Sequence, residues 1–126
     1  MTDILYKEES YTIIGASMEV HNTLGQGFVE EVYHQALKIE FTRRGIPFIS
    51  EAPLEIDYKG TILDKKFFAD FFCYEDIIVE IKAVSKVTPD HEAQIINYLK
   101  ASNIQLGILI NFGAEKLTYK RYLNLY

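Results

Sequence analysis

Apolar residues recur every three to four positions through the first third of the chain, which predicts two helices. The first covers residues 11–24 and is broken by Gly25-Gln26-Gly27. The second covers residues 28–44, where Gly45 supplies a left-handed cap. The chain therefore opens with a helical pair.

From residue 48 the pattern changes to short runs of apolar and aromatic residues, which is typical of strands. Lys59-Gly60 reads as the turn of a hairpin between strands 48–58 and 61–72, and a third strand covers 77–84. A tight reverse connection should place this third strand beside the second.

Thr88-Pro89 has the composition of a helix start, because Thr is a good N-cap and Pro suits the first helical position. This helix ends near residues 101–103, and strands follow at 106–112 and 117–123, the last at an edge. The order α-α-β-β-β-α-β-β predicts an α/β (α+β) fold with a central mixed β-sheet flanked by helices.

Composition narrows the class of protein. The 126 residues are 48% hydrophobic and 25% charged, which fits one globular domain over 1–126 and excludes a disordered or collagen-like chain. The net charge of −5 argues against a protein that coats nucleic acid by bulk charge but leaves room for a local basic groove.

Cellular location is inferred from what the sequence lacks. A single cysteine, Cys73, forms no intrachain disulfide, and we interpret it as a small core residue. There is no signal-peptide pattern and no apolar run of the roughly 18 residues that a membrane helix needs. We therefore expect a cytoplasmic protein without a membrane segment.

Three charged residues interrupt the otherwise apolar second and third strands: Asp70, Glu80 and Lys82. Side chains alternate along a strand, so Glu80 and Lys82 project from one face. Buried carboxylates cost several kcal/mol unless they are paired, so two of them need more than one lysine. Such a cluster suits a divalent metal such as Mg²⁺, and the plain alternative is an ordinary ion pair on a half-exposed sheet face.

Helical residues add candidates to this cluster. Gln94 and Tyr98 lie four positions apart and share a helix face, where they could hold a water or a phosphate, or simply pack with Tyr98 in the core and Gln94 exposed. Glu30 lies in the first turn of the second helix, a position that the helix dipole alone would explain.

These residues together resemble the GxxExxY proteins, a branch of the PD-(D/E)XK nuclease superfamily. Gly27, Glu30 and Tyr33 resemble the G-x-x-E-x-x-Y motif that gives these proteins their name. Asp70 followed by Glu80-Ile81-Lys82 resembles the superfamily motif, with Ala69 in place of the proline in that motif. A Q-x-x-x-Y element matches Gln94 and Tyr98.

The resemblance implies a restriction-endonuclease-like core and a nuclease activity on nucleic acid, with DNA favoured over RNA and a homodimer left open. It implies that Asp70, Glu80 and the backbone carbonyl of Ile81 bind Mg²⁺ or Mn²⁺, and that Lys82 acts on the attacking water. Glu30 would be an additional acidic residue, and Gln94 and Tyr98 would support the site or contact nucleic acid.

The histidines have no spacing that suits zinc. His21 could face the site across the Gly25–Gly27 loop or could be a packed or helix-terminal histidine. His34 shares a face with Glu30 and could orient it, but we expect a solvated residue. His91, in a helix first turn, could touch a phosphate.

Three functional hypotheses follow. The first is a metal-dependent phosphodiesterase that acts through Asp70, Glu80 and Lys82. The second is a non-catalytic module that binds nucleic acid or protein on a nuclease-like scaffold, and the third is a structural or dimerisation protein. The charged cluster favours the first, because a scaffold without chemistry has no need of such costly residues.

Overall fold

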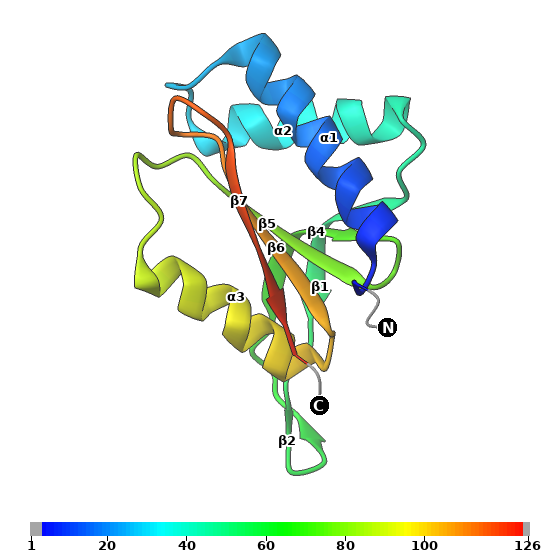
Figure 1. Cartoon of the computed structure of the whole chain (residues 1–126). Coiled ribbons are helices and arrows are strands. Elements are labelled where there is room, and N and C mark those ends of the chain that lie inside the picture. Colours follow the sequence, from blue (N-terminus) through cyan, green and yellow to red (C-terminus); the bar gives the residue numbers. More distant parts are fainter. Residues whose placement is uncertain (1–3, 125–126) are drawn as a thin grey trace.

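The computed structural model describes residues 4–124 and consists of three helices and seven strands in that range (Figure 1). In chain order they are α1 (Lys7–Leu24), α2 (Glu30–Arg43), β1 (Phe48–Leu54), β2 (Asp57–Tyr58), β3 (Thr61–Ile62), β4 (Phe67–Cys73), β5 (Ile77–Lys82), α3 (Pro89–Ser102), β6 (Leu106–Asn111) and β7 (Thr118–Leu123).

Five strands form one mixed sheet in the order β1-β4-β5-β6-β7. The β5–β6 pair is parallel and the other pairs are antiparallel. Parallel neighbours need a long crossover, and α3 supplies it between β5 and β6. The expected mixed sheet, the placement of β5 beside β4, and the edge position of β7 are all confirmed.

Helices cover both faces of this sheet (Figure 1). On one face α1 and α2 pack through Ile13, Leu37 and Phe41 against Phe71 and its neighbours on the inner strands. On the other face α3 packs through Ile95, Tyr98 and Leu99. In the described part of the chain, none of the helices combines the length and apolarity needed to cross a membrane.

The helix boundaries differ modestly from those expected. α1 begins at Lys7 rather than near residue 11. The apolar pattern did not indicate its first turn, because that turn consists of polar residues. α2 begins at Glu30 and ends at Arg43, with Gly45 in the expected left-handed conformation at φ +69°. The Thr88-Pro89 start of α3 is confirmed, since the Thr88 side chain accepts a hydrogen bond from the His91 amide.

The hairpin at Lys59-Gly60 exists, but its two arms are not continuous strands. Each arm is divided, so that β2 and β3 form a separate two-stranded sheet. This small sheet projects beyond α3 (Figure 1) and leaves Tyr58 and Ile62 exposed. No other layer of the described chain packs against β2 and β3 to stabilise them as a continuation of the main sheet.

Candidate active site

The candidate site forms where β4 and β5 stop pairing. Their antiparallel register runs through Phe71 opposite Val79 and goes no further in that direction. Beyond this pair the Asp70 amide donates to Glu80 Oε2 at 2.8 Å, and the Ile81 amide donates to Asp70 Oδ2, also at 2.8 Å. Each carboxylate thus replaces a ladder hydrogen bond with one oxygen and leaves its second oxygen outside these bonds.

The backbone of Ile81 contributes to the same place. In a strand the N–H and C=O of one residue point to the same edge. Because the Ile81 amide points towards Asp70, its carbonyl also faces β4, where the ladder has ended. One carbonyl and two carboxylates therefore converge between these strands.

Glu80 is buried, with 5% of its surface exposed. Loss of solvation is the main reason that its carboxyl pKa is raised, and the negative charge of Asp70 raises it further, while the positive charge of Lys82 lowers it. A buried carboxylate beside a half-buried one resists ionisation of both unless a cation compensates them. The pair is therefore arranged to accept positive charge.

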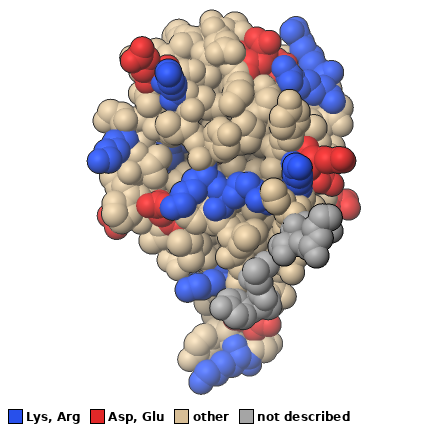
Figure 2. All heavy atoms as spheres, viewed as in Figure 1, with Lys and Arg blue, Asp and Glu red and all other residues tan. Residues whose placement is uncertain are grey.

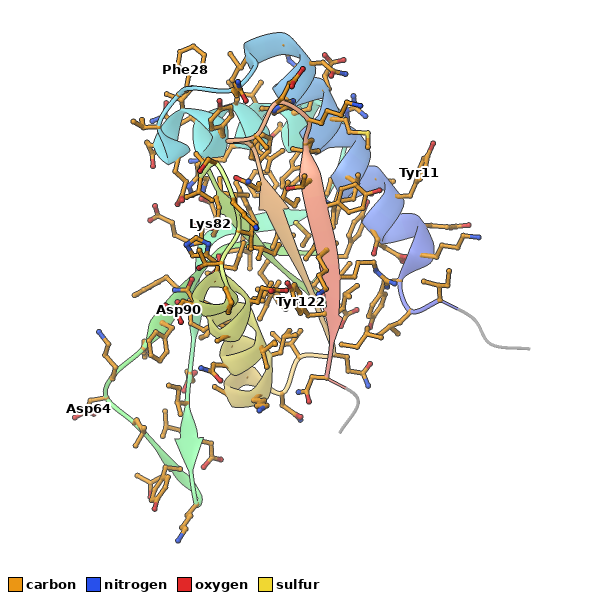
Figure 3. All side chains as sticks on the ribbon, turned by 60° about the vertical axis from the view of Figure 1, so that its left-hand side comes forward. Tyr11, Phe28, Asp64, Lys82, Asp90 and Tyr122 are labelled. Atoms are coloured by element: carbon orange, nitrogen blue, oxygen red, sulfur yellow. The ribbon has the colours of Figure 1, made fainter. Side chains whose placement is uncertain are left out.

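Lys82 is the nearest cationic residue in sequence and stands half-buried at the end of β5. In Figure 3, Lys82 lies between α2 above it and α3 below it. Its positive charge lowers the pKa of both Glu80 and Glu30, which places it within electrostatic reach of both acids. Among residues 4–124 it has no ion-pair partner within 4 Å.

Glu30, the first residue of α2, is exposed and lies within electrostatic range of Asp70 and Lys82. Partial loss of solvation raises its carboxyl pKa, and the charge of Asp70 raises it further, against the opposing effects of Lys82 and His34. It is not a third close ligand, since residues 4–124 contain no group of three or more His, Cys, Asp or Glu side chains placed to hold a metal.

Tyr33 explains the position of Glu30. Its hydroxyl donates to the Gly25 carbonyl at 2.6 Å and accepts from the Phe28 amide at 3.2 Å, which closes the turn between α1 and α2. Its ring is fully buried and stacks on Phe112 with centroids 4.8 Å apart. The tyrosine therefore anchors the turn before α2, and with it the backbone of Glu30.

Gln94 and Tyr98 are joined as their spacing suggests. The Gln94 amide donates to the Tyr98 hydroxyl at 3.1 Å. Tyr98 is buried and Gln94 is exposed, as expected if Tyr98 packs in the core and Gln94 faces solvent. The charges of Glu80 and Asp70 nevertheless raise the Tyr98 pKa after desolvation, which puts the hydroxyl within electrostatic range of the carboxylates.

The structure separates the histidines. His21 is buried at the end of α1, 3.0 Å from the Ala114 carbonyl through Nε2, with its ring near Phe112. Its contacts are those of a packed residue, and none of them is with the carboxylates. His91 closes the capping box of α3, where its Nδ1 accepts from the Thr88 amide.

The expectation that His34 is solvated is wrong. Only 6% of its surface is exposed, its Nε2 lies 3.0 Å from Ser50 Oγ, and its ring packs edge-on against Phe71. The helical pattern placed His34 one turn after Glu30, but it did not show that β1 and β4 would cover this face. Cys73, by contrast, is fully buried as expected, and burial raises its thiol pKa to about 12.

Sequence reasoning missed Asn111, which organises the segment after Lys82. Its Oδ1 accepts from the amides of Val84 and Gly113, and its Nδ2 donates to the Val84 carbonyl at 2.8 Å. A Cβ on Gly113 would lie 2.3 Å from the Val84 nitrogen, so only glycine permits this approach. A buried Asn at the end of an apolar strand was the available signal.

The donor set fits a hard divalent cation. Two carboxylates and a carbonyl are oxygen ligands, and Mg²⁺ binds through one or two carboxylates while it keeps several waters. Burial and the charge of Asp70 raise the pKa of Glu80, so a nearby positive charge would stabilise its ionised form. A fold with helices on both faces of a mixed sheet, and with Asp, Glu and Lys at the point where two strands part, defines the class of restriction-endonuclease-like proteins.

Comparison with known proteins agrees. The family model of the PD-(D/E)XK nuclease superfamily matches residues 7–122, so this chain belongs to that superfamily. The crystal structure of SSO0001 is similar with a TM-score of 0.59 and 19% sequence identity, and the match covers 94% of this chain and 59% of that one. At that identity the likeness shows the fold, and the chain spans about three fifths of that protein's length. Comparison with curated proteins finds no match.

Proposed function

We propose that this protein is a metal-dependent nuclease of the GxxExxY branch, which hydrolyses phosphodiester bonds through Asp70, Glu80 and Lys82. The observation that carries the proposal is the exchange of hydrogen bonds between the two carboxylates and the two strand backbones. It holds both acids side by side and keeps an oxygen of each available. Superfamily membership makes a nucleic acid the expected substrate.

In this proposal Asp70, Glu80 and the Ile81 carbonyl hold Mg²⁺ or Mn²⁺. The ion would supply Lewis acidity and offset the charge on the scissile phosphate. Lys82 orients the attacking water and donates hydrogen bonds to the developing negative charge. Glu30 and the Gln94–Tyr98 pair support the arrangement from α2 and α3. His21 has contacts elsewhere, and we assign it a structural role.

Metal binding can be tested without a substrate. Calorimetric titration of Mn²⁺ into the wild-type chain is expected to show binding that Asp70→Ala abolishes. The matched control is Asp64→Ala, because Asp64 is an exposed carboxylate in the loop before β4. Equal binding by the two variants would place the ion elsewhere and count against this site.

Catalysis is tested by cleavage of labelled single- and double-stranded DNA and RNA with Mg²⁺ or Mn²⁺ present. We expect Asp70→Asn and Lys82→Gln to reduce cleavage at least 100-fold, in line with the contribution of one catalytic group, which is roughly 10²–10⁴. Lys86→Gln is the control for Lys82. Cleavage that persists in both site variants contradicts the proposal, and metal binding without cleavage of any substrate favours the non-catalytic module.

The nucleic acid that we favour is DNA, and a homodimer would allow both strands to be cut. Initial rates on matched DNA and RNA duplexes test the first point. Sedimentation velocity of the free chain and of its complex with a duplex tests the second.

A further inference from the structure

A groove of about 620 Å³ lies between α1 and the edge strand β7, and none of its lining residues belongs to the candidate active site. Its walls are largely apolar and include Ile14, Met18 and Tyr119. Figure 3 shows Tyr11, which also lines the groove, projecting from α1 on the side away from Lys82. Ligand sites of small molecules have this size and this apolar character, with a few polar groups among them.

Two residues that line the groove each carry a buried polar atom whose hydrogen-bonding capacity is unused. Within residues 4–124, Ser10 Oγ and Arg121 Nε are the buried side-chain atoms without a partner, and both residues line this one groove. Native proteins rarely leave such groups unpaired, because each costs about 1–3 kcal/mol. Their coincidence at one place indicates a missing acceptor.

Ser10 is unusual among the helical hydroxyls of this chain. Ser17, Thr42 and Ser102 each donate to the backbone carbonyl four residues earlier. Ser10 lies in the first turn of α1 with 6% of its surface exposed, and its hydroxyl makes no hydrogen bond to any of the described residues. The donor is therefore left for a group outside the helix.

Arg121 supplies a positive charge that no acid neutralises. Its Nη2 donates to the Leu5 carbonyl, and it has no carboxylate within ion-pair distance in the described residues. Arg44, which also lines the groove, is paired with Glu40 at 2.7 Å, and the other charged lining residues are Lys7 and Glu8. In a chain of net charge −5, an unpaired guanidinium beside an apolar wall suits an anion.

We propose that this groove binds a small organic anion. An acidic head, carboxylate or phosphate, accepts hydrogen bonds from Arg121 Nε and Ser10 Oγ, and an apolar body packs against Ile14, Met18 and Tyr119. Both donor atoms are covered, so the head group reaches them after a change of side-chain rotamer, which is common on binding. The site is independent of the proposed nuclease centre.

The test uses the fluorescent dye 1-anilinonaphthalene-8-sulfonate, whose sulfonate head and aromatic body match this chemistry. We expect saturable binding of one dye per chain, at least tenfold weaker in Arg121→Gln and several-fold weaker in Ser10→Ala. The uncharged dye N-phenyl-1-naphthylamine should bind both variants as it binds the wild type. Arg43→Gln, on α2 and outside the groove, is the charge-matched control.

Further measurements keep the result interpretable. Circular dichroism and thermal unfolding show whether each variant is folded, and Met18→Gln provides a half-exposed alternative that should weaken both dyes. Competition by decanoate and by phenyl phosphate distinguishes a carboxylate from a phosphate head. Asp70→Asn should leave dye binding unchanged, which separates this site from the nuclease proposal.

Dye binding that ignores Arg121 and Ser10 would overturn the proposal. So would loss of dye binding as the protein concentration rises, together with sedimentation as a dimer, because the groove would then be covered by a second copy of the chain.

Discussion

Asp70 and Glu80 each have two tasks at once. One oxygen of each side chain replaces a missing strand-to-strand hydrogen bond, and in the proposed function the other binds the metal ion. The structural task explains how two like charges are tolerated at a strand junction, since an amide donor partly compensates each one. It also fixes the carboxylates without any help from a flexible loop.

Removing the charge of Glu80 should stabilise the metal-free protein. Its pKa rises from an ordinary value of 4.5 to about 9 through burial and the charge of Asp70. Between pH 4.5 and about 9, the folded state therefore keeps a proton on Glu80 that the unfolded state has released. The contribution of Glu80 to folding stability is consequently highest below pH 4.5 and decreases as the pH rises towards 9. Gln keeps the acceptor for the Asp70 amide and carries no charge.

We expect Glu80→Gln to raise the Tm in EDTA by several degrees at pH 8, corresponding to about 1–2 kcal/mol, and to have little effect at pH 4.5. Differential scanning calorimetry across this pH range measures the effect. Glu55→Gln, at an exposed position between β1 and β2, serves as the control. A lower Tm for Glu80→Gln at every pH would show that the carboxylate is needed for folding.

At the scale of elements, the site depends on how the end of β6 holds the chain that leaves β5. The Asn111 side chain bonds to both backbone groups of Val84 and to the Gly113 amide. These bonds begin two residues after Lys82. We therefore propose that Asn111 positions the lysine-bearing end of β5.

Asn111→Ala should destabilise the protein by about 1–3 kcal/mol, because it leaves partly buried backbone groups unpaired. Asn111→Asp retains the Oδ1 acceptor but places a buried carboxylate oxygen against the Val84 carbonyl, so it should destabilise the protein at least as much at neutral pH and less at a pH where the new carboxyl is protonated. Urea unfolding measures both. If Asn111 positions Lys82, cleavage by the folded alanine variant falls while its Mn²⁺ affinity is unchanged; equal cleavage by wild type and variant would leave Asn111 a purely structural role.

The sequence predicted the elements wherever one local signal was decisive. The Thr88-Pro89 start of α3, the left-handed Gly45 and the edge strand β7 all follow from such signals. The divided hairpin does not, because whether its arms join the main sheet depends on which layers reach residues 55–66, and no local pattern contains that information.

The candidate site shows the same division. Asp70, Glu80 and Lys82 were detectable because a charge inside an apolar strand is costly and needs a reason. The hydrogen bonds between each carboxylate and the backbone of the opposite strand depend on where the pairing of β4 and β5 ends. The burial of His34 depends on its packing against β1 and β4. These are tertiary facts that a single chain pattern does not encode.

At the scale of the whole molecule, charge does not favour contact with a polyanion. The net charge is −5, and on the face in Figure 2 the Lys and Arg side chains form separate groups, several of them next to acidic ones. The candidate site itself adds Asp70 and Glu30 against Lys82, and Glu80 contributes a further negative charge once a cation displaces its proton. A phosphate would therefore meet repulsion there unless a divalent cation reverses the local charge.

This balance predicts that nucleic-acid binding depends on metal. In Lys82→Gln, which should not cleave, we expect the affinity for a labelled DNA duplex to increase at least tenfold between EDTA and 5 mM Mg²⁺, measured by fluorescence anisotropy at fixed ionic strength. A tenfold change is about 1.4 kcal/mol, which one favourable charge interaction near a protein surface can supply.

Adding Asp70→Asn to Lys82→Gln makes the prediction discriminating. The double variant loses one repelling charge and one metal ligand, so it should bind DNA more tightly than the single variant in EDTA and gain little from Mg²⁺. The control is a double variant that combines Lys82→Gln with Asp64→Asn. Its affinity for DNA should respond to Mg²⁺ as that of the single variant Lys82→Gln does. If Mg²⁺ strengthened binding equally in all three, the ion would act on the DNA or elsewhere on the protein, and the repulsion would not arise at the strand junction.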